Sequence, residues 1–130
     1  MLAVDTNVLV RVLVDDPAAP DQCRAARQTV AEAGKVYVAQ VVQIETVWVL
    51  ASAYGLDKAS LQKTLGVIAD HPAISLQRPE VFKAALGHFQ SGHGDFADCV
   101  ILAESTLAGH ELTTFDRKLG KLAGTRLLAP

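Results

Sequence analysis

The sequence has few cysteines, few aromatic residues and little excess charge. Cys23 and Cys99 are the only two cysteines among 130 residues, and they lie far apart without the short spacing of a metal-binding pair. We therefore expect both thiols to be reduced and buried, as in a cytoplasmic protein. The formal net charge of −2 provides no overall positive field. This argues against a classical DNA-binding module, but not against an enzyme that engages phosphates through a metal ion.

Long apolar runs are also missing. No run approaches the roughly 20 residues that span a bilayer. The first residues lack a basic leader and include Asp5, so we expect no signal peptide. Half of the residues are nevertheless hydrophobic, at 50% of the chain. The length and composition predict a soluble protein with a single domain over residues 1–130 and one buried core.

Short apolar segments alternate with helical patterns along the chain. This alternation predicts an α/β domain with a largely parallel sheet. The helix at 41–54 is apolar almost all round, so we expect it to be buried. The expected strands are 2–4, 35–39, 74–76, 110–114 and 125–128, and the expected helices are 6–14, 20–33, 41–54, one capped by Asp57, one starting at Pro79, and 95–108.

Two acidic residues lie at positions where exposure to solvent alone would not account for a carboxylate. Asp5 follows a buried strand and precedes a helix, which is the edge where open α/β sheets build ligand sites. Its alternative role is to cap that helix. Glu45 lies within the apolar helix, so we expect it to be at least partly buried. A buried carboxylate needs a cation, a hydrogen-bond network or a salt bridge to an arginine.

Three further acids follow in the second half of the chain. Asp95 fits a helix-cap position, and Asp98 lies one turn deeper, before an apolar run. Asp116 follows a strand that ends at Thr114, so it is either a sheet-edge residue or a surface turn residue. Four carboxylates packed together would repel one another, and a hard divalent cation such as Mg²⁺ or Mn²⁺ would relieve that repulsion. Zinc is not indicated, because His88 and His93 lie five apart and are expected at the surface.

These acids stand in short motifs whose order and spacing resemble those of a known family. The motifs are Asp5-Thr6-Asn7-Val8-Leu9 after a short apolar strand, Glu45 in an apolar helix, Asp95-Phe96-Ala97-Asp98, and Thr113-Thr114-Phe115-Asp116-Arg117. Together they resemble the four acidic motifs of PIN domains. With the chain length, they are similar to the VapC toxins of bacterial and archaeal toxin–antitoxin pairs. The resemblance runs over essentially the whole chain.

The resemblance implies a three-layer α/β/α sandwich with a mainly parallel sheet, and a Mg²⁺- or Mn²⁺-dependent endoribonuclease. It also implies a cognate antitoxin as partner and a homodimer. One departure is the glutamine-rich stretch 40–43, where relatives often have a Ser or Thr helix cap. The implied catalytic and metal-site acids are Asp5, Glu45, Asp98 and Asp116, with Asp95 as an accessory ligand and Asn7 and Thr114 as polar helpers.

Substrate contacts and rival functions are less sharply indicated. Basic residues gather near Asp116, namely Arg117, Lys118, Lys121 and Arg126, and they are either an RNA-backbone patch or a solvated face. A phosphotransferase that phosphorylates Asp5 is disfavoured, because the second acid of such enzymes is replaced here by Asn7. A PIN-like module that binds RNA or protein without cutting stays open as the alternative.

Overall fold

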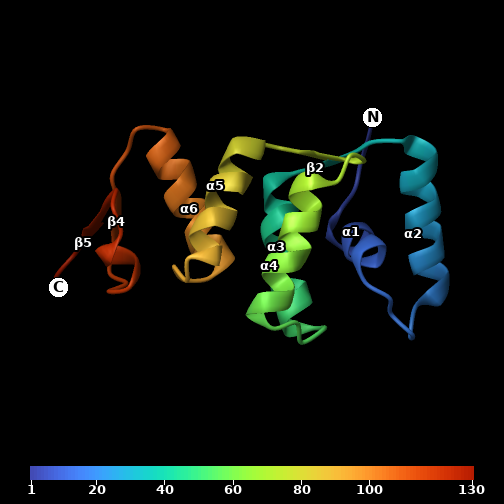
Figure 1. Cartoon of the computed structure of the whole chain (residues 1–130), viewed down its shortest axis with the longest axis horizontal. Coiled ribbons are helices and arrows are strands. Elements are labelled where there is room, and N and C mark those ends of the chain that lie inside the picture. The colour runs from blue at the N-terminus through green and yellow to red at the C-terminus, as the bar shows by residue number, and fades with distance from the viewer. The chain divides into compact units, whose positions relative to one another are not determined.

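Helices and parallel strands alternate along the chain, as the sequence predicts (Figure 1). The computed structural model describes all residues, 1–130. The chain divides into two units, Met1–Gln77 and Arg78–Pro130. Helix 20–33 and strand 74–76 match the prediction to the residue, and the other predicted bounds lie within two residues of those observed. No helix combines the length and the apolar character that crossing a membrane requires.

The first unit contains a three-stranded parallel sheet in the order β1-β2-β3. Leu2 pairs with Val36, and Val36 pairs with Ile74. The central strand is the most buried, since Val36 and Val38 are 0% exposed. The elements of this unit are β1 (Leu2–Ala3), α1 (Thr6–Leu13), α2 (Pro20–Ala33), β2 (Val36–Val38), α3 (Gln40–Ser52), α4 (Lys58–Asp70) and β3 (Ile74–Leu76).

Helices α1, α2 and α3 supply the core that covers this sheet. Helix α1 packs against both α2 and α3. Gly34 (φ 77°) closes α2, and the Asp57 side chain caps α4 as predicted. The core cluster consists of Val4, Leu9, Val30, Val36, Val38 and Val42.

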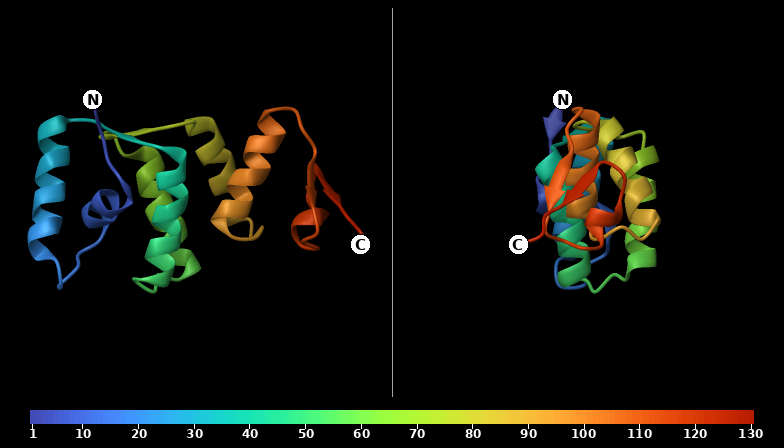
Figure 2. Two further views of the ribbon diagram at one scale, coloured as in Figure 1. Left: turned by 180° about the vertical axis from the view of Figure 1, so that it is seen from behind. Right: turned by 90° about the vertical axis from the view of Figure 1, so that its left-hand side faces the viewer.

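The second unit combines a helix hairpin with a two-stranded parallel sheet. Helices α5 and α6 pack side by side (Figure 2). The apolar face of α5 is buried, and Phe96 of α6 stacks edge-on against Phe82 and Phe89, with ring centroids 5.6 and 5.9 Å away. The elements are α5 (Pro79–Gln90), α6 (Phe96–Leu107), β4 (Leu112–Thr114), a 3-10 turn η1 (Leu119–Lys121) that was not predicted, and β5 (Thr125–Leu127).

The predicted α/β class with parallel strands is confirmed, and so is the burial of both free cysteines. The predicted burial of helix α3 on all sides is wrong. Val41 and Trp48 are 62% and 70% exposed, whereas the opposite side of α3 faces the core. Apolar composition all round a helix therefore does not require burial all round, because the packing partners cover only one face.

One glutamine takes the place of the missing helix cap at the start of α3, and a second glutamine ties this helix to the strand ends. The cap residue is Ala39, whose side chain offers no hydrogen bond. Instead, the Gln77 side-chain oxygen accepts a hydrogen bond from the backbone N–H of Gln40 at 2.8 Å. Gln43 is 3% exposed, and its Nε2 donates to the carbonyls of Val38 and Gln77 at 3.2 and 2.9 Å. The ends of β2 and β3 are thus tied to the helix that carries Glu45.

We predict that Gln43→Leu lowers the free energy of unfolding by about 1–3 kcal/mol, because a side chain of similar size removes both donated hydrogen bonds. The exposed Gln28 provides the control, and Gln28→Leu should change stability by no more than about 0.5 kcal/mol. Urea denaturation of the two variants measures the difference. Equal effects would show that the Gln43 amide does not stabilise this junction.

Candidate active site

Asp5 lies at the carboxyl end of β1 and begins α1. The backbone N–H of Val4 still pairs with the carbonyl of Tyr37 at 3.0 Å, so the strand pairing ends directly before Asp5. The Asp5 Oδ1 accepts a hydrogen bond from the backbone N–H of Val8 at 3.0 Å. The capping role is therefore present. It uses one carboxylate oxygen, and Oδ2 accepts no hydrogen bond in the structure.

Glu45 is exposed, so the predicted partial burial of this carboxylate is wrong. It lies on the same side of α3 as the exposed Val41 and Trp48, four and three residues away. The Thr6 hydroxyl donates to its Oε1 at 3.1 Å. Because Thr6 directly follows Asp5, this bond holds Glu45 beside the end of β1. Sequence reasoning missed Thr6, since a hydroxyl in a first helical turn has many local uses.

Asp95 and Asp98 share the first turn of α6. Asp95 is the helix cap, as predicted, and its Oδ1 accepts from the backbone N–H of Asp98 at 2.8 Å. Asp98 is half-buried. Burial raises the pKa of the Asp98 carboxyl above its ordinary value, and the charges of Asp95 and Asp116 raise it further. A cation at this position would relieve the repulsion that the neighbouring carboxylates cause.

Asp116 follows β4 and begins the turn that leads into η1. Its backbone N–H donates to the Thr114 hydroxyl at 3.0 Å, and its Oδ1 accepts from the backbone N–H groups of Lys118 and Leu119 at 2.8 and 3.0 Å. The turn role weighed for Asp116 is therefore present. As in Asp5, only one carboxylate oxygen is used, and the Thr114 hydroxyl contacts the backbone of Asp116 rather than its carboxylate.

The structure brings the expected acids together in two groups, one in each unit. The first holds Asp5 beside Glu45 through Thr6, and the second holds Asp98 near Asp95 and Asp116. The side chain of Asn7 is exposed and makes no hydrogen bond, so it does not orient either carboxylate directly. In neither unit do three His, Cys, Asp or Glu side chains form a complete metal cage.

The donor set nevertheless fits a hard divalent cation. Mg²⁺ commonly binds one or two carboxylates and fills its other positions with waters and substrate phosphates, so no protein cage is needed. The side chains in both groups offer oxygen donors. Asp5, Glu45 and Asp116 each have one carboxylate oxygen that accepts no hydrogen bond within the protein.

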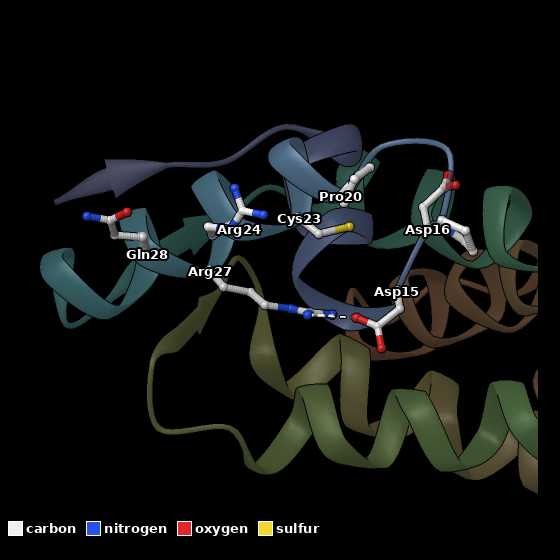
Figure 3. A pocket seen from close by; sticks show the side chains of 8 residues that line it. Asp15, Asp16, Pro20, Cys23, Arg24, Arg27 and Gln28 are labelled. Carbon is white, nitrogen blue, oxygen red and sulfur yellow. Dashed lines mark ion pairs between the residues drawn. The ribbon is translucent and has the colours of Figure 1, made fainter.

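One of the cavities in the first unit is lined by Asp5, and a larger one is not. Asp5 and Asn7 line a pocket of about 360 Å³, together with Arg11, Gln22 and Thr29. A separate cavity of about 690 Å³ beside the α1–α2 connection contains none of the expected acids (Figure 3). An ion pair of 2.7 Å joins Arg27 and Asp15, two of the residues that line it. We assign this second cavity no part in the candidate active site.

These features define an α/β protein with acids at the carboxyl ends of parallel strands and at helix starts. The sequence matches the model of the PIN domain over residues 2–125. The chain therefore belongs to the PIN domain family, whose members are typically nucleases and generally use divalent metals. Searches of curated proteins and of solved structures each found no match.

Gly94 is a site neighbour that sequence reasoning did not single out. It directly precedes the cap Asp95 and has φ +77°, a left-handed conformation. A Cβ atom built on Gly94 would lie 3.2 Å from Oδ2 of Asp98 and 3.4 Å from its Cβ. Gly92 in the same loop has φ +86°, and a Cβ there would meet nothing within 4 Å.

We predict that Gly94→Ala lowers the melting temperature more than Gly92→Ala. Both variants bear the left-handed strain of about 1–2 kcal/mol, but only Gly94→Ala crowds the Asp98 carboxylate. Thermal unfolding measures both, and a Gly94→Ala/Asp98→Ala double variant should not show the excess effect. If the two alanine variants unfold at the same temperature, the approach to Asp98 contributes nothing.

Proposed function

We propose that this chain is a Mg²⁺- or Mn²⁺-dependent endoribonuclease. Membership of the PIN domain family supports a nuclease. The observation that carries the proposal is how the acidic side chains are bonded. Asp5, Glu45 and Asp116 are each fixed through one carboxylate oxygen while the other stays available, and Asp98 is a half-buried carboxyl beside two other acids.

Each acid has a proposed role. Asp5 in the first unit and Asp98 in the second would each be a direct ligand of a bound ion, with Asp95 as an accessory ligand. Glu45 and Asp116 would bind it through waters or act as the general base. When bound, the ion supplies Lewis acidity, which lowers the pKa of a water molecule and offsets charge on the phosphate.

The remaining chemistry follows from these positions. Glu45 or Asp116 would accept the proton of a water that attacks phosphorus in line, and the 3′ oxygen of the preceding ribose would leave. The products carry 5′-phosphate and 3′-hydroxyl ends, because water and not the ribose 2′-OH attacks. The Thr114 hydroxyl holds the backbone of Asp116. The Asn7 amide, which lines the pocket next to Asp5, would contact water or substrate.

RNA binding would draw on local positive charge, because the chain as a whole carries a net charge of −2. Arg117 and Lys118 follow Asp116 directly and are exposed. We propose that they contact the RNA backbone next to the scissile phosphate.

The biological role that we propose is the toxin of a type II toxin–antitoxin system. The resemblance to VapC toxins supports this role. On the same resemblance we propose a cytoplasmic location, a homodimer and a single domain over residues 1–130. The cognate antitoxin would bind these acids through a basic side chain of its own, because a guanidinium pairs with a carboxylate in two parallel hydrogen bonds.

We predict that Asp5→Asn and Asp98→Asn each reduce Mg²⁺-dependent RNA cleavage by about 100-fold or more, which is the scale of losing a residue that stabilises the reacting charge. Asparagine caps helices as well as aspartate does, so Asp5→Asn should keep the start of α1. Cleavage of a labelled RNA with purified protein measures the effect. EDTA should abolish the activity of the unmodified chain.

Asp70→Asn is the matched control, because Asp70 is an exposed acid at the end of α4 outside both acidic groups. It should cleave as the unmodified chain does. Full activity in both Asp5→Asn and Asp98→Asn would refute the assignment. An unmodified chain that binds RNA but never cuts it would instead identify a non-catalytic PIN-like module.

A further inference from the structure

Phe115 differs from every other phenylalanine in the chain. Phe82, Phe89 and Phe96 are 1%, 4% and 2% exposed and form the aromatic core of the second unit, whereas Phe115 is 67% exposed. An exposed aromatic ring lacks the free energy that burial would provide. Phe115 directly precedes Asp116, so this ring stands beside an acid of the proposed site.

Phe115 is one of the residues that line a pocket of about 580 Å³ within the second unit. Leu127 and Leu128 belong to the apolar part of the lining, and they are 45% and 38% exposed. The backbone N–H of Leu128 donates to the carbonyl of Thr114 at 2.7 Å, so the pairing of β4 with β5 continues to the pocket. The pocket therefore lies at the end of the paired strands β4 and β5.

Close packing also holds the turn η1 against this sheet. A Cβ atom built on Gly120 would lie 2.9 Å from the Cβ of Leu127, so only glycine permits the observed approach. The carbonyl of Asp116 accepts a hydrogen bond from the Gly120 N–H at 2.8 Å. These interactions fix the turn that presents Arg117 and Lys121 to the pocket.

The two cations of the pocket have no acidic partner. Arg126 and Arg78 of the same unit pair with Glu111 and Glu104, each at 2.8 Å. Arg117 and Lys121 line the pocket, and neither forms an ion pair. Two unpaired cations beside an exposed ring and an apolar side fit a ligand that carries both a flat apolar face and a negative charge.

We propose that this pocket binds one nucleotide of single-stranded RNA, with its base stacked on Phe115 and its phosphate on Arg117 and Lys121. Stacking accepts any base, because every base has a π face, and the cations follow the backbone. The inference rests on the proposed ribonuclease function and extends it. It assigns Phe115 and Lys121 to substrate binding and places the bound nucleotide next to Asp116.

The test is fluorescence anisotropy with a short labelled single-stranded RNA, in EDTA so that no cleavage occurs. Phe115→Ala should weaken binding by about 5- to 150-fold, the equivalent of removing one stacked base, while Phe115→Trp should retain it. The double variant Arg117→Gln/Lys121→Gln should reduce the slope of log K against log salt by about 0.7, the share of the one phosphate that the two cations neutralise together. Leu107→Ala, which removes another exposed apolar side chain, and Lys83→Gln, which removes another exposed charge, are the matched controls.

Each outcome decides the proposal. It is overturned if Phe115→Ala binds RNA as Leu107→Ala does, if Phe115→Trp fails to bind, if the salt slope is unchanged, or if the unmodified chain binds no RNA. A surface that serves a protein partner would give the first of these results. An unmodified chain that shows all of these binding effects but does not cleave RNA would refute the nuclease function alone, because the binding measurement does not depend on catalysis.

Discussion

A hydrogen bond from a backbone N–H to one oxygen of an aspartate determines where each of three acidic motifs is placed. It begins α1 at Asp5, begins α6 at Asp95, and closes the turn after β4 at Asp116. These bonds satisfy N–H groups that helices and turns otherwise leave without partners. One carboxylate oxygen is sufficient for this hydrogen bond. The same side chain can therefore fix a helix start or a turn and still offer its second oxygen to a ligand. Structure and proposed chemistry therefore share the same residues, and replacement of aspartate by asparagine separates the two contributions.

The supports of these acids come from polar and small residues. Thr6 holds Glu45, the Thr114 hydroxyl accepts from the backbone N–H of Asp116, and Gln77 replaces the missing cap of α3. Gly94 leaves room for the Asp98 carboxylate. Of these contacts, the Thr6 hydroxyl bond reaches a carboxylate directly, and bonds of this kind orient the ligands of metal sites.

The sequence was sufficient for most elements of the fold, because periodic apolar positions and capping residues are local signals. It also identified Asp95 as a cap and placed Asp5 and Asp116 at strand ends. It failed for Glu45, whose helix is apolar all round, since the sequence does not say which face its neighbours cover. It missed Thr6, Gln77 and Gly94 because their roles depend on tertiary interactions between distant residues, or on a close approach that no pattern records.

The claim that these carboxylates support hydrolysis by a metal-activated water is tested most directly by the products of RNA cleavage. The measurement is mass spectrometry of fragments formed in Mg²⁺ and water labelled with heavy oxygen. The account predicts that solvent oxygen enters the new 5′-phosphate, that the other end is a 3′-hydroxyl, and that EDTA stops the reaction. Fragments ending in a 2′,3′-cyclic phosphate, or cleavage that persists in EDTA, would contradict it.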